Sequence, residues 1–152
     1  MTPGELGGFL DTLDREYAEE HARAGTWSRE QALERAREET RKLLPNGTDT
    51  PDHYLRTVLD EPSGERVGEV WYAVRDDGGI RQIWIFWIGI DPAHRRKGFA
   101  ADVLKQLEGE ARRLGVGYLA LHVFGQNTGA IALYEKSGFV PTNVIMRKSL
   151  PS

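Results

Sequence analysis

The sequence predicts a mixed α/β fold with a central mixed sheet, and three observations lead to this prediction. Apolar residues recur at helical spacing as far as about residue 44, short β-type runs follow from 54 to 90, and strand and helix then alternate to residue 150. The period of the apolar residues is the main signal that separates helix from strand. A chain of 152 residues has the size of one ordinary domain, so we expect a single domain over residues 1–152.

The first third of the chain is predicted to form two amphipathic helices. Apolar residues recur every three or four positions from about Glu5 to His21, which is the pattern of a helix with one buried face. Ser28 and Gln31 have the spacing of a capping box, and the second helix that they start ends at Pro45. The polar faces of both helices are expected to be solvated or to form part of an acceptor wall.

Three short strands are predicted next, over residues 54–59, 67–74 and 80–90. Turn-forming residues separate them, which indicates an antiparallel meander. The third run is almost continuously apolar, as is typical of a central strand covered on both faces.

From residue 99 onward the chain alternates between the two kinds of element. We predict a helix from Phe99 that ends at Gly115, a strand over 118–123, a short helix over 130–136 and a last strand over 140–150. Successive strands joined through a helix imply right-handed crossovers.

Composition excludes several classes of function. With 20 Lys and Arg against 23 Asp and Glu, the net charge is −3. This charge argues against a nucleic-acid binder, which needs a concentrated surplus of positive charge. It suits a cationic acceptor. Cysteine is absent, so disulfides, thiolate metal sites and a cysteine nucleophile are excluded. The four histidines are scattered without ligand spacing, and no metal is predicted.

The sequence also indicates where in the cell the protein is expected. No stretch reaches the roughly 18 apolar residues that would span a bilayer, and no basic region followed by an apolar run opens the chain. We therefore expect neither membrane insertion nor secretion, and the lack of cysteine favours a cytoplasmic protein.

The segment Asp91–Ala101 joins a buried strand to an amphipathic helix and is a candidate anion-binding turn. The first N–H groups of a helix lack internal partners and carry the positive end of its dipole, so main chain alone can hold a diphosphate. Gly98 and Ala100 permit close approach, and three basic residues add charge at the rim: Arg95, Arg96 and Lys97. Taken alone, this pattern is more often a solvated loop.

A second motif follows one helix and one strand later. Asn127 and Tyr134 are seven residues apart in a segment that ends at Gly138-Phe139, so they lie about two helical turns apart. Singly, a helix cap and a partly buried ring explain them. Together, Arg95-x-x-Gly98-x-Ala100 and the later Asn127-to-Phe139 segment resemble the GCN5-related N-acetyltransferase (GNAT) superfamily over nearly the whole chain.

The resemblance implies a fold and an acetyl-CoA site. It implies a meander, a splayed parallel pair formed by strands 83–90 and 118–123, and flanking helices. The chain departs from the superfamily's pattern at both ends, because its first edge strand is expected to be short or absent and it has room for only a short C-terminal hairpin. It also implies that the cofactor lies between the splayed strands. The resemblance implies that the pantetheine arm contacts Ile88, Gly89, Ile90 and Asn127. It implies that the pyrophosphate is bound by Arg95, Arg96, Lys97, Gly98, Phe99, Ala100 and Ala101. Tyr134 is implied to lie near the sulfur.

The predicted chemistry is direct attack of an amine on the thioester in a ternary complex, because no cysteine can form an acyl-enzyme. Tyr134 is the candidate general acid for the departing thiolate. For the base, Leu121-His122-Val123 resembles the segment of some protein N-terminal acetyltransferases in which the histidine is the base. Glu69, a carboxylate on a neighbouring strand, is the rival; a packed or solvated role for His122 is equally compatible with the sequence.

Two function hypotheses remain at this point. One is an N-acetyltransferase acting on a small amine or on a protein N-terminus or lysine. The other is a non-catalytic acyl-CoA-binding sensor, although the presence of both Asn127 and Tyr134 favours the enzyme. The short N-terminus would leave a sheet edge exposed, which makes a homodimer plausible.

Overall fold

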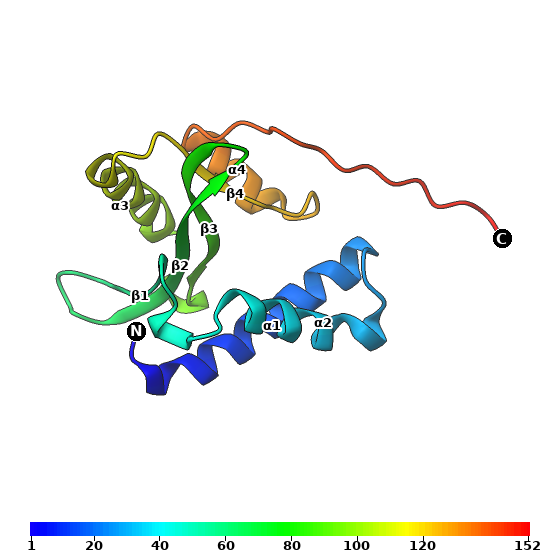
Figure 1. Ribbon diagram of the computed structural model, residues 1–152, viewed down its shortest axis with the longest axis horizontal. Coiled ribbons are helices and arrows are strands. Elements are labelled where there is room, and N and C mark those ends of the chain that lie inside the picture. The colour runs from blue at the N-terminus through cyan, green and yellow to red at the C-terminus, as the bar shows by residue number, and fades with distance from the viewer.

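The computed structural model describes residues 1–152 and confirms the mixed α/β fold (Figure 1). Its regular elements are α1 (Pro3–Ala24), α2 (Arg29–Leu43), β1 (His53–Leu59), β2 (Arg66–Asp77), β3 (Ile80–Ile90), α3 (Phe99–Leu114), β4 (Leu119–Leu121) and α4 (Thr128–Lys136), with short 3₁₀ turns at Gly47–Asp49 and Pro92–His94.

The four strands form one sheet in the order β1-β2-β3-β4. The first three are antiparallel neighbours, whereas β4 runs parallel to β3 and pairs with only Ile83–Ile85. A bulge interrupts the β2–β3 register where Trp71 lies opposite Trp87 and Tyr72 lies opposite Ile85. β3 continues to Ile90 after β4 has ended, so the parallel pair separates at the end of β3, as predicted.

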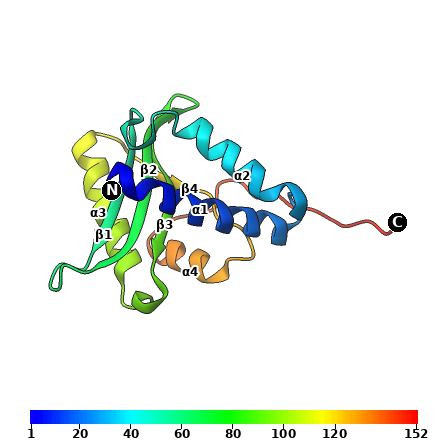
Figure 2. The same cartoon turned by 90° about the horizontal axis from the view of Figure 1, so that it is seen from below.

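The sheet has an apolar cluster on each face because successive strand residues point to opposite sides. Val70 and Tyr72 of β2 pack with Leu104 of α3, whereas Trp71 packs with Phe9 of α1. Figure 2 shows α1 crossing the sheet on the side away from α3. Helices therefore cover both faces of β3, which accounts for its almost continuous apolar run.

The helical pair is held together by small residues and one buried polar contact. Ala18 of α1 packs against Ala32 and Ala36 of α2, and such small side chains let the helices approach closely. The Thr40 hydroxyl lies 2.5 Å from Asp14 Oδ1, with both residues buried. Burial raises the pKa of the Asp14 carboxyl, although the Thr40 hydrogen bond opposes the rise.

Some local predictions need correction. Ser28 is the N-cap of α2, but its side chain makes no capping hydrogen bond. No strand precedes α1, in agreement with the expectation of a short or absent first strand. The Met1 amino group donates to the Leu55 carbonyl oxygen of β1 at 3.3 Å. The predicted strand over 140–150 is wrong. These residues pair with no strand, because none lies beside them. They leave the body as an extended tail (Figure 1).

Candidate functional site

The turn between β3 and α3 presents a run of free backbone donors. Arg96 and Gly98 both have positive φ, 63° and 85°, and α3 begins at Phe99. None of the N–H groups from Arg96 to Ala101 has an acceptor within the chain. Successive N–H groups arranged in this way at a helix N-terminus form a concave site for an anion.

The side chains of this turn have different roles. Arg95 Nε donates to the Ile90 carbonyl oxygen at 2.9 Å, so this residue ties the turn to the end of β3. Arg96 and Lys97 are exposed and form no ion pair within the chain. A Cβ added at Gly98 would meet no atom within 4 Å, so the positive φ, and not crowding, requires glycine there.

The end of β3 has a strand neighbour on one side only. Ile88, Gly89 and Ile90 pair with β2, whereas β4 pairs no farther than Ile85. Gly89 is required because a Cβ there would overlap the Trp87 indole. The backbone of residues 88–90 therefore lies beside the opening between β3 and β4, next to the free amides of the turn.

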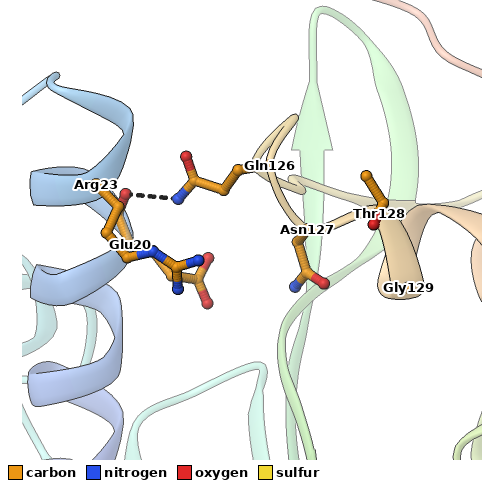
Figure 3. Close-up of a pocket in the computed structure, with 6 residues that line it drawn as sticks. All are labelled: Glu20, Arg23, Gln126, Asn127, Thr128 and Gly129. Atoms are coloured by element: carbon orange, nitrogen blue, oxygen red, sulfur yellow. Dashed lines mark hydrogen bonds between the residues drawn. The ribbon is translucent and has the colours of Figure 1, made fainter.

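A cavity of about 250 Å³ lies between α1 and the loop that begins α4 (Figure 3). Its lining is entirely polar or glycine: Glu20, Arg23, Gln126, Asn127, Thr128 and Gly129. Gln126 Nε2 donates to the Glu20 carbonyl oxygen at 2.9 Å, a contact between residues 106 positions apart. This bond joins the helical pair to the second half of the chain.

Asn127 has a structural role and also faces the cavity. Its Oδ1 accepts a hydrogen bond from the Ala130 N–H at 3.2 Å and so caps α4. The side-chain amide nitrogen makes no hydrogen bond to the protein and is left for a ligand. The cap suggested by the sequence is therefore compatible with a binding role.

Tyr134 lies on α4, partly buried against the core on the α3 side and 5.7 Å from the Phe139 ring. Burial raises the pKa of its hydroxyl, and the charge of Glu20 raises it further. The Tyr134 hydroxyl is thus protonated at neutral pH. Glu20 belongs to α1, so the fold brings together two groups from opposite ends of the chain.

Glu20 itself is partly buried, which makes its carboxyl a weaker acid than a solvated one. Burial raises the pKa of its carboxyl, the nearby Glu16 raises it too, and Arg23 acts in the opposite direction. Sequence reasoning did not single out Glu20, Arg23 or Gln126, and treated the polar face of α1 only as a solvated face or acceptor wall. No local motif marks them, since they meet Asn127 only through the tertiary fold.

His122 follows β4, and its ring lies edge-on to Phe124 at 4.8 Å. Loss of solvation lowers its pKa, so the imidazole is neutral at physiological pH and able to accept a proton. Phe124 also contacts His21 of α1 at 4.8 Å between ring centroids. His122 therefore lies on the side of the sheet that faces the helical pair.

Glu69 occupies a different position. It pairs across the β2–β3 ladder with Gly89, which places it beside the end of β3, and its carboxylate forms an ion pair with Arg66. No contact joins Glu69 to Tyr134 or Asn127. The structure thus groups Asn127 and Tyr134 with Glu20, and leaves Glu69 in an ion pair.

No three His, Asp or Glu side chains lie close enough together to hold a metal ion. None of the helices combines the length and apolar character needed to cross a bilayer.

This chain is similar to proteins named as N-acetyltransferases. The family described as acetyltransferase (GNAT) family matches residues 10–139. YdgE and YycN of Bacillus subtilis (strain 168) are both named as uncharacterised N-acetyltransferases, and they are 35% and 36% identical to this chain, respectively. Each alignment covers 99% of this chain; it covers 95% of YdgE and 96% of YycN. The crystal structure of YycN superposes with a TM-score of 0.91 at 35% identity over 100% of this chain and 96% of that one. A stretch of 55 residues is 42% identical to the ribosomal protein bS18-alanine N-acetyltransferase of Escherichia coli (strain K12), covering 36% of this chain and 37% of that enzyme.

Proposed function

Because the chain belongs to the acetyltransferase (GNAT) family, we propose that it transfers the acetyl group of acetyl-CoA to a primary amine by direct attack in a ternary complex. Two features of the structure carry this proposal. These are the free amides of Arg96–Ala101 and, from α4, Asn127 and Tyr134.

The turn supports the binding of the donor. The backbone N–H groups from Arg96 to Ala101, among them those of Phe99 and Ala100, would hold the pyrophosphate, with Arg96 and Lys97 adding charge. The backbone of Ile88–Ile90 and the Asn127 amide nitrogen would contact the pantetheine arm. Arg95 contributes indirectly, because its bond to Ile90 fixes the turn relative to β3.

Tyr134 is the proposed general acid. The amine nitrogen forms a bond to the carbonyl carbon, the carbon–sulfur bond breaks, and the Tyr134 hydroxyl donates a proton to the departing thiolate. Because burial and Glu20 keep this hydroxyl protonated, it is available as a donor before the reaction. A main-chain N–H of Ile88–Ile90 would donate to the developing oxyanion.

His122 is the proposed base, and Glu69 is the alternative. The lowered pKa of His122 supports a neutral imidazole that removes a proton from the amine, directly or through water. Glu69 would first have to release Arg66, to which it is ion-paired. This difference favours His122.

The polar cavity supports a cationic acceptor. Glu20 lines it beside Asn127 and near Tyr134, so a carboxylate there would attract the ammonium form of an amine before its deprotonation. The acceptor is a small amine, or a protein N-terminus or lysine. Similarity to an enzyme named for the alanine of a ribosomal protein makes a peptide N-terminus the first acceptor to test.

Thermal unfolding with ligands tests the donor site. Acetyl-CoA and CoA should raise the unfolding temperature, because a ligand that binds only the folded state stabilises it by about 2.7 kcal/mol at a concentration of 100 times its Kd. ATP should leave the unfolding temperature unchanged. Absence of any shift with acetyl-CoA would contradict the site.

Release of free thiol from acetyl-CoA, measured across a panel of amines and peptide N-termini, tests catalysis. Turnover with at least one amine and intersecting double-reciprocal lines are expected for a ternary complex. Parallel lines would indicate a covalent acyl-enzyme instead. Binding of acetyl-CoA without turnover on any amine would support the acyl-CoA sensor.

A further inference from the structure

Two opposite charges lie side by side in the wall of the polar cavity. Glu20 and Arg23 both line it, and because they are three residues apart on α1, their side chains leave the same face of the helix. Figure 3 shows them opposite the loop that begins α4. Neither side chain belongs to any ion pair of the chain. The cavity therefore offers one carboxylate and one guanidinium to a ligand.

The facing wall of the cavity supplies further hydrogen-bond donors. The Gly129 N–H has no acceptor within the chain, and Thr128 adds a hydroxyl. Together with the Arg23 guanidinium, these donors match the oxygens of a carboxylate, which form strong bonds to charged donors. Glu20 is the one acidic residue of the lining and matches an ammonium group. The cavity thus suits a ligand that carries both charges.

The size and lining of the cavity limit the rest of the ligand. Ligand sites usually measure about 300–1,000 Å³ and are mostly apolar, whereas this cavity has about 250 Å³ and no hydrophobic residue in its wall. A large apolar group would gain little there, because hydrophobic stabilisation comes from apolar surface removed from water. The ligand is therefore compact, and any side chain that it buries in the cavity is small or polar.

One hydrogen bond holds the two walls of the cavity together. Gln126 Nε2 donates to the main-chain carbonyl oxygen of Glu20 at 2.9 Å, as the dashed line in Figure 3 shows. Because this bond uses the main chain of Glu20, the carboxylate of the same residue stays free for a ligand. The charges on α1 and the donors on the facing loop are thus held in place before a ligand binds, which lowers the entropic cost of binding.

We propose that this cavity binds a free amino acid with a small or polar side chain, and that this amino acid is the acceptor. Its ammonium group pairs with Glu20, and its carboxylate accepts from Arg23 and the Gly129 N–H. A peptide N-terminus and a lysine side chain have no carboxylate beside the amine, so either would leave Arg23 without a partner. This inference rests on the proposed transfer to an amine and narrows the acceptor to one class.

The reaction of such an acceptor balances with the groups already named. His122 takes one proton from the ammonium group, and the nitrogen then bonds to the carbonyl carbon as the carbon–sulfur bond breaks. The thiolate takes the Tyr134 proton, and the nitrogen gives up its second proton to restore Tyr134. The products are an N-acetylamino acid, CoA and one proton. Because the product has lost its positive charge, it no longer pairs with Glu20 and is released.

Calorimetric titration with the standard L-amino acids, with and without CoA, tests the ligand class on the natural chain. At least one small or polar amino acid should bind at a single site. Its amide and its decarboxylated amine should bind at least about tenfold more weakly, because neither has the carboxylate. Three outcomes would overturn the proposal: no binding by any small or polar amino acid, equal affinity for the amide, or loss of binding in the presence of CoA, which would assign the cavity to the donor.

Substitution of Arg23 tests how the carboxylate is recognised. Arg23→Gln should lower the affinity for the amino acid at least about tenfold and leave the affinity for its amide unchanged, whereas Arg23→Lys should restore part of the loss. Arg15→Gln, on the same helix but paired with Asp11 outside the cavity, is the matched control. An equal loss for the amino acid and its amide would contradict a bond from Arg23 to the carboxylate.

Thiol release from acetyl-CoA with the same compounds separates this inference from the proposed function. The amino acid that binds should also be acetylated, with a higher kcat/KM than its amide or its decarboxylated amine. Turnover of peptides or simple amines without any binding of amino acids would overturn the inference and leave the transfer intact. Binding of an amino acid that depends on Arg23, without thiol release, would support the cavity as an amino-acid site and count against the transfer.

Discussion

At the scale of single residues, Tyr134 allows the most direct test of the chemistry. Tyr134→Phe removes the hydroxyl and keeps the ring packed against Phe139. We expect kcat to fall by about 10²-fold or more, the usual contribution of a positioned acid, while the Kd for acetyl-CoA changes little. Tyr118→Phe, at an exposed tyrosine outside the cavity, is the matched control. Full turnover in Tyr134→Phe would show that this residue is not the acid.

His122 and Glu69 can be separated by the pH dependence of kcat/KM. Because the pKa of His122 is lowered, we expect activity to rise with pH through an inflection below about 6.5, the ordinary histidine value. Protonation removes the base, so activity is lost on the acid side. His122→Ala should lower the rate and lose this limb. A limb that persists in His122→Ala but disappears in Glu69→Gln would assign the base to Glu69.

Glu20 permits a test of how the acceptor is recognised. Glu20→Gln removes the charge but keeps the size, so we expect the KM for a cationic amine to rise about tenfold, since hydrogen bonds to charged groups contribute about 1.5–3 kcal/mol. The Kd for acetyl-CoA should remain close to that of the natural chain. Glu19→Gln, on the same helix in an exposed ion pair with Arg29, is the control. An unchanged acceptor KM would remove Glu20 from the acceptor site.

At the scale of elements, α3 offers a matched pair of glycines. Gly98 precedes the helix and Gly115 follows it, with φ of 85° and 71°, and a Cβ at either position would meet no atom within 4 Å. Alanine at either site should therefore destabilise the fold by a similar amount, about 1–2 kcal/mol for the left-handed backbone. Only Gly98→Ala should also weaken CoA binding, measured by calorimetric titration. Equal affinity in both variants would contradict the proposed pyrophosphate turn.

The same helix shows which elements local sequence predicts well. Residues 99–114 were predicted as helical and are helical. The glycines that bound this helix end it through their own backbone conformation, so the residues near each end are enough to predict it. β4 was predicted over 118–123 but covers only Leu119–Leu121, and 140–150 form no strand. A strand extends only as far as its partner does, and nothing within the segment itself specifies that partner.

At the scale of the whole molecule, three histidines predict how stability depends on pH. Burial lowers the pKa of His21, His53 and His122, so the unfolded chain binds protons more readily than the folded one. This contribution is complete above about pH 7.5 and is lost as the pH falls through about 6.5. The raised pKa values of Asp14 and Glu20 act in the opposite direction at lower pH, where protonation of these carboxyls favours the folded state.

Urea denaturation at fixed protein concentration measures this effect. The midpoint should fall between about pH 7.5 and 5.5. His21→Gln/His53→Gln should show a smaller decrease, since His21 Nε2 is buried without a partner and His53 Nδ1 accepts the Trp71 Nε1–H bond at 3.0 Å. A midpoint that stays constant or rises on acidification would contradict the prediction.

Local sequence was sufficient for the fold class, most helix boundaries and the turn before α3, because turn glycines, caps and apolar periods act over a few residues. It also offered Asn127 and Tyr134 as candidates, because they lie in one short motif. Tertiary structure alone placed Glu20 beside them, through a contact that spans 106 positions, and left residues 140–150 without a partner. Burial, charge coupling and strand pairing depend on segments far apart in the chain, so no local pattern specifies them.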